Sequence, residues 1–168
     1  MPKHSLSQSD PFVPEDFQVP EGLENQYFRL RPLTVHDVVK DYDAVMSSLD
    51  HLQGVFGPES SWPSPDLTLE QDLIDLGWHQ KEFQMRSSFA YTVVSLDEER
   101  VLGCVYIDPA DTDEFDVCVT LWVRADIVDR GYDDILFDTV DEWILSDWPF
   151  RNPGYPGRTL DWDDWLSL

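Results

Sequence analysis

Three stretches rich in β-branched and aromatic residues follow one another in the middle of the chain, and they restrict its fold more than any other feature. They read FAYTVVSL (89–96), VLGCVYID (101–108) and VCVTLWVR (117–124). Such stretches are typical of β-strands, and the short polar segments between them, DEER and ADTDEFD, are typical of turns. Consecutive strands joined in this way pair in antiparallel fashion. The sequence therefore predicts a meander of three strands.

One strand and two helices are expected before this meander. NQYFRLRPLT (25–34) has the alternating pattern of a first strand. Thr34 can cap a helix whose apolar residues recur at helical spacing, namely Val35, Val38, Val39, Tyr42, Val45, Met46 and Leu49. The segment Thr68–Gln71 has the pattern of a capping box and predicts a second helix that ends near Met85. Between the two helices we expect a long loop, residues 50–66, rich in glycine, proline and aromatic residues.

A third amphipathic helix is expected to begin at Tyr132. Its apolar positions are Ile135, Leu136, Val140, Trp143 and Ile144. The order of strand, two helices, three strands and helix predicts an α/β (α+β) fold with a mixed, largely antiparallel, twisted sheet flanked by helices. We expect residues 1–24 to form an N-terminal arm, 25–148 the domain, and 149–168 an aromatic tail that packs on the domain.

The charge of the chain excludes several classes of partner. Its 34 acidic residues outnumber 11 lysines and arginines, which gives a formal net charge of -23. Such a surface resembles that of halophilic cytoplasmic proteins, in which salt screens the repulsion, and it disfavours nucleic acids and anionic membranes as partners. The two cysteines fit a reduced, cytoplasmic protein better than a disulfide scaffold. The four histidines lack the spacing of metal ligands, so no metal site is expected.

The order of the elements from Phe28 to Trp148 resembles the GNAT family of N-acetyltransferases. The stretches that carry the resemblance are FRLRPLTVHDV, AYTVVSLDEERVLGCVYIDP and VTLWVRADIVDRGYDDILFDTVDEWI. The resemblance implies the acyl-CoA N-acyltransferase fold, shortened at its C-terminus, since the segment after Trp148 is too short and proline-rich for the elements that follow in the family. Members bind acetyl-CoA in a splay between the fourth and fifth strands and transfer the acetyl group to an amine.

The resemblance also indicates which residues would bind the cofactor. The backbone of Leu121, Trp122 and Val123 would contact the thioester and the pantetheine arm. Arg130 and Gly131 would belong to the pyrophosphate loop. In the family this loop reads Arg or Gln, two variable residues, Gly, one variable residue, and then Gly or Ala. Aligned without gaps, the loop corresponds to residues 128–133, and of its characteristic residues only the first glycine, Gly131, is present.

Asp133 occupies the last position of this loop. Its Cβ hinders the approach of a phosphate, and its charge repels the phosphate by on the order of a few kcal/mol at a few ångströms. As an alternative, Asp133 and Asp134 stabilise the start of the helix by about 0.3–1 kcal/mol each, because they complement its dipole. We favour this structural interpretation of the loop.

The resemblance places Cys118 where many relatives carry a glutamate general base. Glu114 and Asp116 lie nearby in the sequence and could accept a proton through water, so the three residues are the catalytic candidates. A strand cysteine is more often part of the core, and no nearby basic residue lowers its pKa. Tyr155, the only tyrosine of the tail, is not assigned the general-acid role that a tyrosine has in the family.

Two functions remain open from the sequence. One is an N-acetyltransferase that transfers an acetyl group from acetyl-CoA to a small-molecule or peptide amine, as a monomer or a homodimer. The other is a non-catalytic binding or assembly module of the same fold that has lost the pyrophosphate loop.

Overall fold

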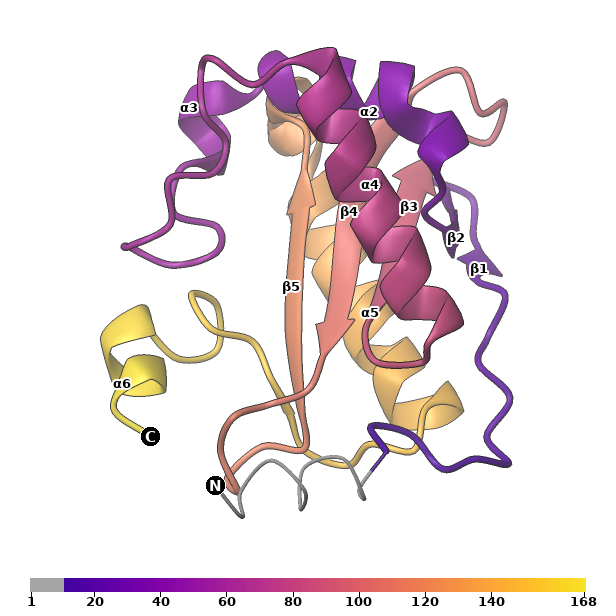
Figure 1. Ribbon diagram of the computed structural model, residues 1–168, viewed down its shortest axis with the longest axis vertical. Coiled ribbons are helices and arrows are strands. Elements are labelled where there is room, and N and C mark those ends of the chain that lie inside the picture. Colours follow the sequence, from indigo (N-terminus) through magenta and orange to yellow (C-terminus); the bar gives the residue numbers. More distant parts are fainter. Residues whose placement is uncertain (1–10) are drawn as a thin grey trace.

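The computed structural model describes residues 11–168 and contains a six-stranded sheet (Figure 1). Its strands follow the chain in the order β1-β2-β3-β4-β5-β6. They are β1 (Leu23–Glu24), β2 (Arg29–Pro32), β3 (Phe89–Val94), β4 (Val101–Asp108), β5 (Val117–Val123) and β6 (Pro153–Gly154). All pairs are antiparallel except β5 with β6, which is parallel. The predicted fold class, a mixed and largely antiparallel sheet flanked by helices, is therefore confirmed.

The predicted meander forms the centre of the sheet. Strand β4 covers the residues expected of it, whereas β3 ends two residues and β5 one residue earlier than predicted. All residues of β3 and all but one in each of β4 and β5 are buried. A sheet that is buried in this way must be covered on both faces.

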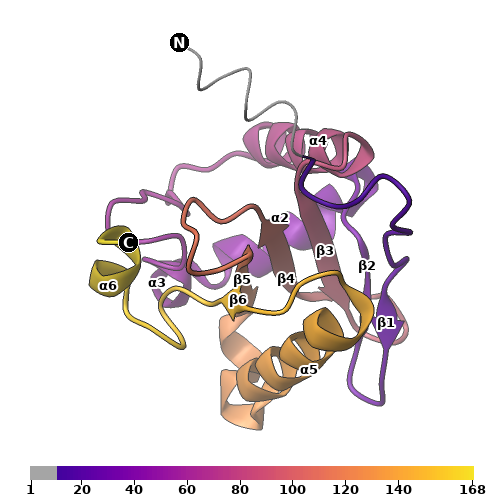
Figure 2. The same cartoon turned by 90° about the horizontal axis from the view of Figure 1, so that it is seen from below.

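Helices provide this cover (Figures 1 and 2). α2 (Val38–Met46) and α4 (Leu69–Gln84) lie on one face of the sheet, and α5 (Tyr132–Asp147) lies on the other. The Thr68–Gln71 capping box begins α4 as predicted, because each side chain bonds the backbone amide of the other residue. Leu136, Val140 and Ile144 of α5 are fully buried against the sheet.

The first predicted helix is divided into three pieces. Thr34 caps a short 3-10 turn, η1 (Val35–Asp37), which leads into α2, and α3 (Leu49–Leu52) follows separately. The hydroxyl group of Ser47 donates to the carbonyl oxygens of Asp43 and Ala44. Such back-bonding competes with helix propagation, and the helix ends there.

The described part of the N-terminal segment packs against the sheet. Val13 is buried in the core. The guanidinium group of Arg86 donates to the carbonyl oxygens of Pro14 and Phe17, and the hydroxyl group of Tyr91 donates to that of Pro20. Residues 1–10 of the expected arm lie outside the described residues.

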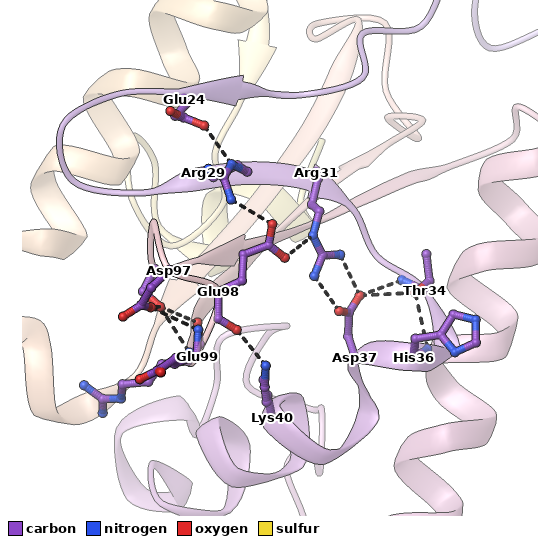
Figure 3. Close-up of polar contacts among 12 residues, drawn as sticks. Glu24, Arg29, Arg31, Thr34, His36, Asp37, Lys40, Asp97, Glu98 and Glu99 are labelled. Carbon is purple, nitrogen blue, oxygen red and sulfur yellow. Dashed lines mark hydrogen bonds and ion pairs between the residues drawn. The ribbon is translucent and has the colours of Figure 1, made fainter.

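A network of ion pairs fixes the turn between β3 and β4 to β2 and α2 (Figure 3). The carboxylate of Glu98 accepts hydrogen bonds from Arg29 at 2.7 Å and from Arg31 at 2.9 Å. Arg31 also forms a bidentate pair with the buried Asp37, and Lys40 donates to the carbonyl oxygen of Glu98. The network thus joins β2, the turn between β3 and β4, and the start of α2, and uses three of the eleven cationic side chains.

The segment after α5 returns across the sheet and ends in α6 (Trp162–Leu166). Trp148, Phe150 and Tyr155 are buried in the core, where the rings of Trp148 and Phe89 lie 5.2 Å apart. Trp162 is only partly buried, and its ring contacts Gly57 and Gly157. The tail is therefore attached to the sheet by three aromatic anchors.

Substitution of two glycines, Gly103 in the sheet and Gly77 in α4, tests how closely the chain is packed around each. A Cβ atom at Gly103 in β4 would lie 2.1 Å from the carbonyl oxygen of Trp122 in β5, whereas one at Gly77 in α4 would make an ordinary contact of 3.8 Å with Val35. We expect Gly103→Ala to lower the free energy of unfolding by about 2 kcal/mol or more. Gly77→Ala should raise it by up to about 1 kcal/mol, because alanine favours helix. Urea unfolding of both variants in molar salt measures this, and equal effects would contradict the packing described.

Candidate functional site

Strand β5 has a complete partner on one side only. β4 pairs with it from Cys118 to Val123, whereas β6 pairs only with Val117 and Cys118. Beyond that point the chain turns away and leaves an open groove of about 390 Å³. The groove is lined by residues 51–55 after α2, residues 120–122 of β5, Val128 and Asp133 near the start of α5, and residues 156–158 with Trp162 of the tail. The elements that line it, namely β5, the loop that follows α3 and the tail that carries α6, can be followed in Figure 1.

Arg158 crosses this groove. Its guanidinium group donates to the carbonyl oxygen of Leu121 at 3.1 Å and forms a bidentate ion pair with Asp133 at 2.8 and 2.9 Å. This pairing with Arg158 holds the pKa of Asp133 below its ordinary value. The charge of Asp133, which the sequence interpretation set against a phosphate, is therefore compensated by a residue of the tail.

The start of α5 is an open helix N-terminus next to the groove. Gly131 has a φ of +79°, a conformation that glycine adopts without strain, and follows the 3-10 turn η2 (Ala125–Arg130). Within the described chain, no side chain caps this helix, and no atom lies within 4 Å of a Cβ placed on Gly131. The first amides of such a helix can bind an anion, whereas the acids of its first turn oppose one.

Two of the predicted cofactor-binding residues line the groove, namely Leu121 and Trp122. Val123 lies at the end of β5, where its carbonyl oxygen is 3.1 Å from Nε2 of His51. Arg130 and Gly131 lie just before α5, and the guanidinium group of Arg130 is 5.0 Å from the centre of the Tyr132 ring. The structure thus brings Leu121 and Trp122 to the groove, whereas Val123, Arg130 and Gly131 do not line it and the side chain of Arg130 is stacked on Tyr132.

The catalytic candidates lie elsewhere. Glu114 and Asp116 precede β5, and Asp116 is five residues from Leu121, or about 17 Å along a strand. The carboxylate of Asp116 accepts hydrogen bonds from the amides of Arg151 and Asn152, so it fastens the tail. Burial raises the pKa of Cys118 to about 12, which keeps its thiol protonated.

Tyr155 is also part of the structure rather than of the groove. Its ring is buried, and its hydroxyl group donates to Asp141 of α5 at 2.9 Å. Burial is the main reason why the pKa of this phenol lies well above its usual value. Such a group holds its proton and anchors the tail.

A second, smaller pocket of about 240 Å³ lies on the α2 and α4 side of the sheet. Its lining combines acidic with apolar and aromatic side chains: Leu33, Asp41, Phe56, Trp62, Asp72, Asp75, Leu76, His79 and Tyr106. Burial raises the pKa values of Asp41, Asp72 and Asp75, and in Asp41 the neighbouring Asp72 adds to this effect. The sequence interpretation missed this pocket because it treated the acids as a solvated coat. The available signal was the spacing of Asp72, Asp75, Leu76 and His79, which places them on one face of a helix.

Trp122 lies between the two cavities. It lines the groove, while its Nε1 donates to the hydroxyl group of Tyr106, which lines the acidic pocket, at 3.1 Å. Its ring is also 6.1 Å from that of Trp62 in the same pocket. A single side chain therefore borders both cavities.

Comparison with known proteins identifies the fold. No protein-family model and no curated protein sequence matches the chain. Among solved structures, a ribosomal-protein-S5-alanine acetyltransferase from Vibrio fischeri superimposes with a TM-score of 0.64 at 16% identity, over 87% of this chain and 80% of that one. A protein assigned to the GNAT acetyltransferase family from Bordetella pertussis gives 0.54 at 13% identity, over 76% and 73%.

A third similar structure contains ligands. It is the microcin C7 self-immunity acetyltransferase MccE in complex with acetyl-CoA and AMP, with a TM-score of 0.55 at 12% identity over 77% of this chain and 71% of that one. The chain therefore has the GNAT acetyltransferase fold. Among the described residues, no helix combines the length and apolar character needed to cross a membrane.

The ion pair in the groove predicts a pH dependence. Because the pKa of Asp133 is lowered in the folded state, the pair stabilises the protein above the ordinary aspartate pKa, and this contribution is lost as the pH falls through the lowered value. We expect Arg158→Gln to raise the pKa of Asp133 towards its ordinary value, as measured by carboxyl NMR titration. The variant should be less stable than the original protein at neutral pH and should approach it in acid. An unchanged Asp133 titration would contradict the ion pair.

Proposed function

We propose that the chain is an N-acetyltransferase that uses acetyl-CoA as the acetyl donor and an amine as the acceptor. The observation that carries this proposal is the groove between β5 and the tail, which opens beside an uncapped helix N-terminus in a GNAT fold. In the GNAT family the gap beside the strand that corresponds to β5 binds acetyl-CoA, and MccE, which shares the fold, was crystallised with that ligand.

The residues of the groove fit the parts of acetyl-CoA. The amides at the start of α5 suit the pyrophosphate, because they are helix N-terminal groups with a favourable dipole. The backbone of residues 120–122 suits the amide-containing pantetheine arm, since β6 does not pair with it there. Arg158 is the cationic side chain of the groove, and its pair with Asp133 has to open before Arg158 can bind a phosphate.

The transfer itself requires one proton acceptor. The neutral amine attacks the thioester carbonyl, the C–S bond breaks, CoA leaves as a thiolate, and the proton of the acetylated nitrogen passes to a base. Among the titratable residues that line the groove, we assign this role to His51. Its Nε2 faces a carbonyl oxygen of β5 at 3.1 Å and must donate to it, so Nδ1 of the neutral ring keeps a free lone pair.

One observation favours the non-catalytic alternative. Arg158 donates to the carbonyl oxygen of Leu121 and spans the groove with an intramolecular ion pair, as a module that has no cofactor would do. Binding of acetyl-CoA and turnover of an amine therefore have to be measured separately.

The first test is calorimetric titration with acetyl-CoA in molar KCl. We expect binding, and we expect Asp133→Asn to tighten it about tenfold, or by about 1.4 kcal/mol, because the change removes a negative charge and releases Arg158. Asparagine is chosen because glycine would also weaken the helix. Asp138→Asn, an exposed acid one turn further along α5, is the matched control and should bind like the original protein. Absence of heat with millimolar acetyl-CoA in both the original protein and Asp133→Asn would reject the proposal.

The second test is turnover, followed as release of the CoA thiol in the presence of primary amines. We expect His51→Gln to lower kcat by about 100-fold or more, the usual effect of losing a general base, without weakening acetyl-CoA binding. His36→Gln, an exposed histidine of η1, is the control and should retain activity. Equal turnover in the two variants would contradict the assignment of His51 as the general base. Bound acetyl-CoA without transfer to any amine would favour the non-catalytic module.

A further inference from the structure

The acidic pocket buries carboxylates that have no cationic partner. Only 2% of Asp72 and 4% of Asp41 is exposed to solvent. Asp72 Oδ2 has no hydrogen-bond donor among the described residues, and its neighbour is the carboxyl group of Asp41, so that only a shared proton can join the two. A buried carboxylate is unfavourable unless a cation or several donors compensate it. The two carboxyl groups are therefore either neutralised by protons, as their raised pKa values indicate, or paired with a cation.

Among the side chains of the lining, only the imidazole ring of His79 can carry a positive charge. α2 contributes Asp41, and α4 contributes Asp72, Asp75 and His79. No lysine or arginine of the described chain lines the pocket, and the ring of His79 stacks near Tyr106 with centres 5.3 Å apart. A cation that pairs with Asp72 at close range would therefore come from a ligand.

The aromatic side chains that line the pocket indicate which kind of cation it can bind. The ring of Phe56 lies 5.1 Å from those of both Trp62 and Tyr106, each in an edge-to-face arrangement. Aromatic rings attract organic ammonium groups and cover their alkyl chains, whereas a metal ion needs several oxygen, nitrogen or sulfur ligands. Within the described residues, no group of three such side chains has the geometry of a metal site. At about 240 Å³ the pocket is smaller than the sites of drug-sized ligands and suits a short chain.

We propose that the acidic pocket binds an alkylammonium group. If the proposed transferase activity holds, on which this step rests, the acceptor carries a second nitrogen. The nitrogen that attacks the thioester must be unprotonated, so the ammonium group held by Asp72 is another one of the same molecule. Trp122, which borders both cavities, lies between this anchored end and the groove. The substrate class is then a small aliphatic amine with two or more nitrogens.

The experiment measures binding of butylammonium chloride to the full chain by calorimetry in molar KCl, with n-butanol as a neutral probe of similar shape. We expect butylammonium to bind and to raise Tm, and n-butanol to do neither. Asp72→Asn should weaken butylammonium binding by at least about tenfold, the size of one charge-assisted contact. Glu70→Gln removes the same charge from the exposed side of the first turn of α4 and should leave binding unchanged.

A second variant tests butylammonium binding without changing the charge of the pocket. Phe56→Leu preserves an apolar side chain but removes the ring, and it should also weaken butylammonium binding. If Asp72→Asn does not fold, the comparison of Phe56→Leu with the original protein decides whether the pocket binds butylammonium. The inference is overturned if n-butanol binds as well as butylammonium, or if Asp72→Asn and Glu70→Gln bind alike.

The same samples separate this inference from the proposed function. Acetyl-CoA is titrated into each of them without amine. Butylammonium binding without acetyl-CoA binding supports the pocket and rejects the transferase. Acetyl-CoA binding without butylammonium binding supports the transferase and rejects the pocket.

Discussion

The incomplete pairing of β5 is the constraint on which the site depends. Backbone groups of a strand need partners, and β5 finds them along β4 but only for two residues along β6. The turn of the tail after Gly154 opens the groove and exposes the backbone of residues 120–122 to it. Arg158 satisfies one of these carbonyl groups from across the groove. The same gap thus forms a candidate ligand site and leaves backbone carbonyl groups of β5 with which the tail can form hydrogen bonds.

The acids of this chain differ in whether a cationic side chain pairs with them, because such side chains are few. Arg29 and Arg31 pair with Glu98 and Asp37, and Arg158 pairs with Asp133, so these carboxylates have structural roles. Most other acids are exposed, where salt screens their repulsion. In the α2 and α4 pocket, Asp41 and Asp72 are buried, and no lysine or arginine of the described residues lines it. Burial without compensation, rather than acidity itself, distinguishes a binding site in such a protein.

The sequence was informative about the site in a limited way. The resemblance to the GNAT family led to Leu121 and Trp122, because a strand followed by a helix can be recognised from composition and periodicity. It also indicated that Asp133 stands where a phosphate would bind, but not that Arg158 compensates it, since the two residues are 25 positions apart and their contact depends on how the tail returns. For the same reason the sequence could not separate Asp72 from the surrounding acids or show that Asp116 binds the backbone of the tail.

The sequence by itself determined the order of the main strands and helices and the boundaries of the central strands to within two residues, but not β1, β6, α6 or the division of the first helix. Local signals sufficed for this: the Thr68 capping box, the alternation in β2, and the short turns that force β3, β4 and β5 to pair in antiparallel fashion. Tertiary structure alone decided where the parallel strand β6 stops, which cation meets which carboxylate, and which acids are buried with aromatic rings. These outcomes depend on the packing of segments that are distant in the chain, and pairwise contacts of that kind leave no periodic pattern in a single sequence.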